Sequence, residues 1–323
     1  MNSAKANRII AKFPNQNILI IGDVMLDSAV WGKVERISPE APVPVVHVQK
    51  ETYVPGGAAN VANNIKALDG QVTLIGLVGN DNNRKILEKQ FRQHQIDTKY
   101  LLIDRQRPTI RKTRIMGIPQ HQLLRIDEEV TDTVSPAMAR QLVAQVKKAI
   151  KRAKALVISD YAKGVISLEV ARAAIAAAHE QSIPVIIDPK PEHKDFYSQA
   201  TVVTPNQKEV LKMAGNGEDD LKAGINLARE LDANIVLTRS EAGMAIIQKG
   251  QRPKLIKTKA KEVFDVSGAG DTVVAGLALA LAGGSDLVSA ADIANHAAGV
   301  VVGKVGTSTL TRGELRKVLK NSR

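Results

Sequence analysis

The chain has 323 residues, 44% of them hydrophobic, and a formal net charge of +12. It contains no cysteine, which excludes disulfides, thiolate metal sites and cysteine nucleophiles and fits a reducing compartment such as the cytoplasm. No apolar run reaches the roughly 18 residues of a membrane-spanning helix, and the first residues lack the apolar segment of a secretory signal.

The positive charge raises the question of nucleic-acid binding. Basic residues are spread along the chain, and only four Tyr and four Phe accompany them as stacking platforms for bases. Neither a zinc-finger spacing nor a basic zipper is present. We therefore favour a solvated basic surface over nucleic-acid binding, because net charge alone indicates only solubility and nonspecific association. Such a surface also suits an anionic substrate.

Short apolar runs alternate with helical patterns along most of the chain. Continuous runs of this kind are typical of strands buried on both faces of a parallel sheet. The expected strands are 17–23, 72–79, 155–160, 184–189, 201–206 and 234–240. The expected helices are 57–68, 82–94, 135–153, 168–182, 206–213 and 219–231, followed by 271–283, 287–303 and 312–320. The alternation predicts an α/β fold with a doubly wound, mostly parallel sheet.

Residues 41–54 and 108–127 depart from this alternation, because they show period-two strand patterns with turn signals. They are either ordinary surface hairpins or a small β sheet that covers one edge of the main sheet. We favour a β lid formed from about 35–54 and 108–127. No Pro/Gly/Ser-rich linker divides the chain, so we expect residues 1–323 to form a single domain with this insertion.

The first candidate binding residues lie near the ends of early elements. Asp23 and Asp27 flank the end of the first strand, where open α/β sheets bind ligands. Their carboxylates can accept hydrogen bonds from sugar hydroxyls or simply cap a turn. Gly56 and Gly57 allow a ligand to approach the backbone before a helix that carries Asn60, and the alternative there is a tight turn.

The strongest local motif is Gly268-Ala269-Gly270-Asp271, directly ahead of an apolar helix. Glycine is unfavourable inside helices by roughly 1 kcal/mol relative to alanine. Backbone N–H groups at a helix start bind anions, and an adjacent carboxylate can take a proton from an alcohol. Phosphoryl transfer needs those two parts side by side, although Asp271 also suits the helix dipole as a structural residue. The Walker A and dinucleotide G-x-G-x-x-G patterns are absent from the sequence.

Two long stretches carry a family resemblance. "PGGAANVANNIKALDGQVTLIGLVGND" and "VSGAGDTVVAGLALAL" resemble the N- and C-terminal signatures of the ribokinase (PfkB-type) family of sugar and nucleoside kinases. "SDYAKGV", "IIDPK" and "TPNQKEV" resemble the branch that phosphorylates D-glycero-D-manno-heptose 7-phosphate at O1, in the synthesis of ADP-heptose for lipopolysaccharide. This kinase is often fused to an adenylyltransferase with an H-x-G-H motif; the motif is absent here, so the chain resembles the kinase part alone.

The resemblance implies a ribokinase-like fold with ATP and Mg²⁺ as cofactors. We further expect a cytoplasmic homodimer and, from the composition, no nucleic-acid or membrane partner. It implies that Asp271 is the catalytic base and that Gly268, Ala269 and Gly270 form an anion hole. The residues implied at the ATP phosphates and magnesium are Asn206, Gln207, Lys208 and Glu209, with Glu209 near the metal directly or through water. The residues implied at the sugar are Asp23, Asp27, Gly56, Gly57 and Asn60.

The residue that holds the substrate phosphate is left open by these motifs. Lys163 is the first candidate, with Arg111 and Arg114 on the expected lid behind it, and a solvated surface lysine is the alternative. Other kinases of the family, acting on fructose 6-phosphate, ribose or a nucleoside, are rival interpretations. A non-catalytic sugar-phosphate-binding regulator is a third, and the presence of both Asp271 and Glu209 counts against it.

Overall fold

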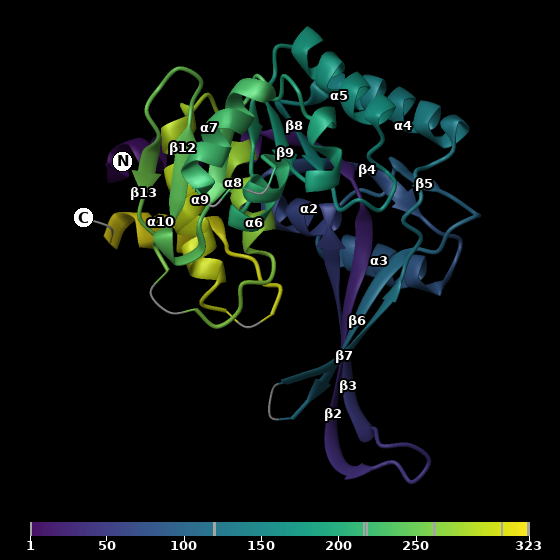
Figure 1. Ribbon diagram of the computed structural model, residues 1–323. Helices are drawn as coiled ribbons and strands as arrows, with labels where there is room; N and C mark the ends of the chain where they lie inside the picture. Colours follow the sequence, from purple (N-terminus) through teal and green to yellow (C-terminus); the bar gives the residue numbers. More distant parts are fainter. Residues whose placement is uncertain are drawn as a thin grey trace.

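A computed structural model describes residues 2–118, 121–215, 217, 219–260, 263–304 and 306–321. Within these ranges the centre of the molecule is a nine-stranded sheet with the order β13-β12-β11-β10-β9-β8-β1-β4-β5 (Figure 1). Neighbours from β5 to β11 pair in parallel, and β12 and β13 are antiparallel. Its strands are β1 (Asn17–Gly22), β4 (Gln71–Val78), β5 (Leu101–Ile103), β8 (Ala155–Ser159), β9 (Val185–Asp188), β10 (Val202–Val203), β11 (Asn234–Thr238), β12 (Met244–Ile247) and β13 (Lys254–Ile256).

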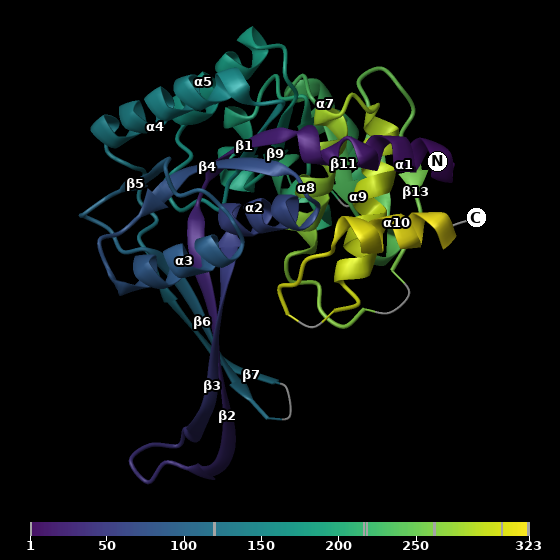
Figure 2. The same ribbon diagram turned by 180° about the vertical axis from the view of Figure 1, so that it is seen from behind.

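Helices cover both faces of this sheet (Figures 1 and 2). One core joins the sheet to α1 (Ser3–Ala11), α2 (Ala58–Ala67), α3 (Asn82–Gln93), α8 (Ala269–Ala282), α9 (Leu287–Val301) and α10 (Arg312–Asn321). The other joins it to α4 (Pro136–Ala149), α5 (Leu168–Glu180), α6 (Gln207–Met213) and α7 (Asp220–Glu230). Short 3-10 turns lie at Phe13–Asn15, Ile150–Arg152, Pro191–Phe196 and Ser240–Ala242. The predicted doubly wound α/β fold is therefore confirmed.

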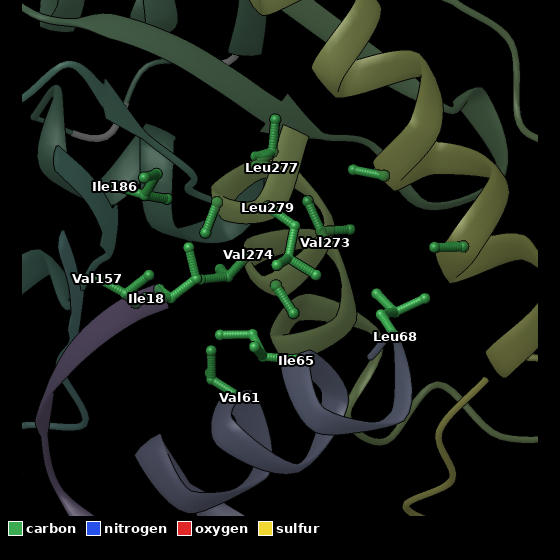
Figure 3. Close-up of a cluster of buried hydrophobic side chains, with 14 of the residues drawn as sticks. Ile18, Val61, Ile65, Leu68, Val157, Ile186, Val273, Val274, Leu277 and Leu279 are labelled. Atoms are coloured by element: carbon green, nitrogen blue, oxygen red, sulfur yellow. The ribbon is translucent and has the colours of Figure 1, made fainter. Parts of the chain in front are cut away.

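The first core fixes the helix that begins at the Gly268–Asp271 motif. Val274 and Leu277 of α8 pack with Val61 and Ile65 of α2 and with Ile18 of β1, all buried (Figure 3). Burying side chains of this size contributes roughly 1.5–3 kcal/mol each. The start of α8 is thus held against α2 and the central strands. No helix of the described ranges has the length and apolar character needed to cross a membrane.

A separate four-stranded sheet projects from the molecule, with the order β3-β2-β6-β7 (Figures 1 and 2). Its strands are β2 (Val24–Ile37), β3 (Pro44–Gly57), β6 (Ile110–Gly117) and β7 (His121–Glu128). The small sheet was predicted, but from about 35–54 and 108–127, so most of β2 was missed. β2 begins with three buried residues, Val24 to Leu26, and these hide the alternation that marks a half-exposed strand.

Candidate active site

Backbone conformation and steric crowding explain why position 268 is a glycine. Gly268 is the N-cap of α8 at φ +79°, in the left-handed region that side chains disfavour. A Cβ there would lie 2.9 Å from Asn60 Nδ2 and 3.1 Å from Thr307 Cγ2. At Gly270, by contrast, a Cβ would meet no described atom within 4 Å. The backbone at Gly270 therefore borders open space, which leaves room for a ligand.

The first turn of α8 offers fewer free amides than the sequence implied. The N–H of Ala269 donates to Val266 O at 3.2 Å, so it is already occupied. The first helical hydrogen bond runs from Thr272 N–H to Gly268 O at 3.0 Å. The N–H groups of Gly270 and Asp271 precede that bond, and first-turn groups of this kind have no partner inside a helix. They are the donors that an anion would meet.

Asp271 is buried at this helix start with both carboxylate oxygens hydrogen-bonded. Asn60 Nδ2 donates to Oδ2 at 2.6 Å, and the Tyr161 hydroxyl donates to Oδ1 at 3.0 Å. Burial raises the pKa of Asp271 from 3.8 to about 6, these two hydrogen bonds oppose that rise, and the charge of Asp27 adds to it. A carboxylate with a pKa near neutrality is a suitable proton acceptor at physiological pH.

Asp27 and the paired glycines lie beside this carboxylate. A Cβ at Gly56 would lie 2.4 Å from Asp27 Oδ2, so glycine there makes room for the Asp27 side chain. Gly57 is the N-cap of α2 at φ +56°, where a Cβ would lie 2.5 Å from Asp23 O. Packing within the protein therefore accounts for both glycines. Arg114 Nη1 donates to Asp27 Oδ1 at 2.8 Å, which leaves the other Asp27 oxygen facing Gly56.

Asp23 has a position that does not favour the expected sugar contact. Its side chain is fully buried, and its carboxylate accepts the backbone N–H groups of Tyr161, Lys163 and Val165 at 2.8 to 3.2 Å. Burial raises the pKa of Asp23 to about 6, with a contribution from the charge of Asp160. Asp23 thus holds the loop after β8, and this loop carries the tyrosine that contacts Asp271.

Tyr161 and Lys190 are site residues that the sequence analysis did not select, although both lie in the quoted motifs "SDYAKGV" and "IIDPK". Lys190 Nζ lies 5.0 Å above the ring of Tyr161 and 3.5 Å from Glu209 Oε1. Burial and the charges of Asp271 and Glu209 raise the pKa of Asp188 well above its usual range, and Lys190 opposes that rise. Lys190 is therefore a cation that offsets the carboxyl groups of Asp188, Glu209 and Asp271.

The expected nucleotide element forms the start of α6. The Asn206 side chain accepts the N–H of Glu209 at 3.0 Å, and Glu209 Oε2 accepts the N–H of Asn206 at 2.9 Å, a reciprocal capping box. Gln207 donates to Asp220 Oδ2 at 2.9 Å, while Lys208 is exposed. Glu209 keeps one oxygen, Oε1, that faces Lys190 rather than the backbone.

A magnesium site built only from protein groups is not found among the described residues, which hold no cluster of three or more metal-binding side chains. Mg²⁺ usually retains several waters and takes one or two carboxylates together with substrate phosphates. Glu209 Oε1, which the capping box does not use and which lies 3.5 Å from Lys190 Nζ, fits the requirement for one such carboxylate oxygen.

The three cations considered for a substrate phosphate are separated by the structure. Lys163 Nζ is bound to Glu129 at 2.6 Å, and Arg111 is bound to Glu51 at 2.6 Å. Arg111 also donates to Ser28 and so lies on the face of the small sheet opposite Asp27. Arg114 lies on the same face as Asp27 and lines a cavity of about 680 Å³ between the small sheet and the segments 264–267 and 306–307.

Solved structures share this architecture. A ribokinase from Arabidopsis thaliana, solved with ribose and ATP, matches 94% of this chain and 99% of its own with a TM-score of 0.75 and 18% identity. Phosphofructokinase-2 from Escherichia coli, solved with substrates and products, matches 95% of this chain and 100% of its own with a TM-score of 0.76 and 21% identity. At these identities the likeness establishes the fold, which is that of ribokinase.

The relatives at higher identity define the class of enzyme. The chain is 44% identical over 310 residues to the bifunctional protein HldE of Azorhizobium caulinodans, covering 94% of this chain and 64% of that protein. It is 45% identical over 304 residues to the same-named protein of Geobacter sulfurreducens, covering 93% and 62%. The chain thus spans somewhat under two thirds of these relatives. The model of the pfkB family of carbohydrate kinases matches residues 15–312. Fold and sequence together define a sugar kinase, and the chain belongs to the pfkB family.

Proposed function

We propose that this carbohydrate kinase transfers the γ-phosphate of ATP to O1 of D-glycero-D-manno-heptose 7-phosphate, giving the 1,7-bisphosphate used for ADP-heptose and lipopolysaccharide. The identity to the HldE relatives and the "SDYAKGV", "IIDPK" and "TPNQKEV" motifs support this substrate. The observation that carries the chemistry is Asp271, a buried carboxylate with a pKa of about 6 at the start of α8. With ATP as donor, we expect the reaction in the cytoplasm.

In the proposed reaction Asp271 accepts the proton of the O1 hydroxyl, and O1 attacks the γ-phosphorus in line as the bond to the β-phosphate oxygen breaks. Asn60 and Tyr161 hold the carboxylate in place, since each donates to one of its oxygens. The N–H groups of Gly270 and Asp271 stabilise the charge on the transferring group. Asp27 accepts hydrogen bonds from sugar hydroxyls through the oxygen that Arg114 does not occupy.

Lys190 supplies positive charge to the same step. The carboxylates of Glu209 and Asp271 would repel an incoming triphosphate. Lys190 Nζ lies 3.5 Å from Glu209 Oε1, and its charge lowers the pKa of Asp271. Fixed cations at a transferring phosphoryl group stabilise its transition state. Glu209 and Asp188 would hold a Mg²⁺ ion through water, and such an ion would neutralise charge on the phosphates.

Two alternative functions can be distinguished from this one by measuring which sugars the protein phosphorylates. A family member acting on fructose 6-phosphate, ribose or a nucleoside has the same base and helix start, and a non-catalytic regulator binds a sugar phosphate without consuming ATP. A coupled assay across these sugars tests all three. We expect kcat/KM to be highest for heptose 7-phosphate. Preference for a neutral sugar would overturn the heptose assignment, and absence of turnover with every sugar would favour the regulator.

The projecting sheet supports a homodimer. Cross-strand pairs place Val30, Ile115 and Leu124 side by side on the face opposite Asp27, and Leu124 is 56% exposed. Ile126 and Val48 extend this apolar face. Contiguous exposed apolar surface marks interaction sites, and two-fold dimers bury the same patch of both copies. We expect Leu124→Asp to convert the dimer to a monomer in light scattering, and a wild-type monomer would overturn the proposal.

A further inference from the structure

The cavity beside the small sheet is long and lies along β2. Asp27, Ala29 and Trp31 alternate along one face of that strand and line the cavity. Four residues of strand span about 13 Å, so Trp31 lies well outward from Asp27. Asp27 packs against Gly56, just before the helix that carries Asn60, and Asn60 donates to Asp271, so the inner end of the cavity lies near the expected base. Trp31, at the outer end, lies farther along β2, which is a strand of the projecting sheet (Figure 1).

The two ends of this cavity differ in charge. Asp27 lies at the inner end, where sugar hydroxyls are expected. Lys50 of β3 is the direct cross-strand partner of Trp31 and lies at the outer end. Its side chain is exposed, and no ion pair is found for it among the described residues. Arg114 of β6 pairs with Ala29, between the two ends.

Lys50 and Arg114 are the basic side chains among the described residues that line the cavity. Arg114 donates one Nη1 hydrogen bond to Asp27, and a guanidinium has five donors in all. On the opposite wall, Asp265 is held by the N–H groups of Ser267 and Gly306, at 2.8 and 3.1 Å. The carboxylate of Asp265 is thus engaged with its own loop, and Lys50 is left to face a ligand.

We propose that Lys50, assisted by Arg114, is the binding site for a phosphate monoester at the end of the substrate remote from the reacting hydroxyl. This inference rests on the proposed function and replaces Lys163 as the expected phosphate ligand. Lys163 and Lys112 share Glu129, and Lys112 also pairs with Asp127, so two carboxylates balance the two lysines. Arg111 lies on the other face of the sheet and is bound to Glu51. The spacing along β2 selects a substrate with its phosphate far from the hydroxyl that is phosphorylated.

The test compares kcat/KM for heptose 7-phosphate and for unphosphorylated heptose. Charge-assisted hydrogen bonds to phosphate are strong enough that Lys50→Met should lower kcat/KM for heptose 7-phosphate by about 10- to 100-fold. The value for unphosphorylated heptose should stay unchanged, and Lys50→Arg should restore most of the loss. Lys163→Met should change the preference little. Lys148→Met, at an exposed lysine of α4, is the control for net charge.

The outcomes separate this inference from the proposed function. If the wild-type enzyme prefers heptose 7-phosphate and Lys50→Met keeps that preference in full, the phosphate lies elsewhere and the inference is wrong. An equal loss for both sugars would also overturn it, because a phosphate site cannot act on a neutral sugar. If the wild-type enzyme shows no preference for the phosphorylated sugar, the proposed function itself fails, whatever the variant does.

Discussion

Replacing Asp271 by Asn should make the protein more stable while removing its activity. The pKa of Asp271 rises from 3.8 to about 6 on folding because the carboxylate is buried. A tenfold change in proton affinity corresponds to about 1.4 kcal/mol, so the ionised carboxylate destabilises the folded state by roughly 3 kcal/mol at neutral pH. The folded state binds this proton more tightly than the unfolded state. Protonation of Asp271 therefore stabilises the folded state. This stabilisation is complete below about pH 4 and is lost as the pH rises through about 6.

Asparagine preserves the local hydrogen bonds. Its side-chain oxygen can accept from Asn60 Nδ2, and its amide can donate to the Tyr161 hydroxyl, which both donates and accepts. The variant should therefore lose the charge without leaving a buried polar group unpaired. Loss of a general base lowers rates by about 10²- to 10⁴-fold, and kcat should fall by that factor while ATP affinity changes little.

Urea unfolding of both proteins at pH 8 and at pH 4.5 measures the effect on stability. We expect Asp271→Asn to have the higher midpoint at pH 8 and the difference to shrink at pH 4.5. Asp286→Asn is the control, because Asp286 caps α9 and binds Lys5, which lowers its pKa although burial opposes that change. The control should gain no stability at pH 8 and keep its kcat. A variant at position 271 that is less stable at pH 8, or that turns over normally, would refute the reasoning.

Three further predictions concern the same site. The kcat/KM of the wild-type enzyme should rise as the pH passes about 6 and then level off, since Asp271 must be ionised to accept a proton; a profile flat from pH 5 to 8 would contradict this. Lys190→Met should lower kcat by about 10²-fold or more and move the midpoint of that profile upward, because Lys190 lowers the pKa of Asp271; an unmoved midpoint would place Lys190 outside the site. Glu209→Gln keeps an oxygen for the capping box but should raise the Mg²⁺ concentration needed for half-maximal activity, and an unchanged titration would leave Glu209 with the capping role alone.

The main sheet was predictable because its strands are short apolar runs buried on both faces, as "NILIIGD" and "ALVISD" are. The Gly268–Asp271 motif could also be recognised from the sequence. Helix propensity disfavours two glycines ahead of an apolar helix, so the motif indicates a role other than helix stability. β2 was largely missed because it follows β1 after a single residue and begins with buried side chains.

The contacts of individual cations could not be read from the sequence. Lys163 meets Glu129 from 34 residues away, and that pairing depends on how the loop after β8 folds against the small sheet. Lys50 lines the cavity only because it pairs with Trp31 in the β2–β3 register. That register shifts at a bulge directly after Trp31, and the sequence does not reveal the bulge. Tyr161 and Lys190 lie in loops, and only the packing of the ends of β8 and β9 against α8 brings them to Asp271.

The most direct test of the account is the structure of the product. Heptose 7-phosphate and ATP are incubated with the enzyme and Mg²⁺, and the sugar is analysed by ³¹P NMR with coupling to the attached protons. We predict two phosphate monoesters on one sugar, with the new phosphorus coupled to the anomeric proton at C1. A new phosphate at any other carbon, or release of inorganic phosphate from ATP with the sugar unchanged, would contradict the account.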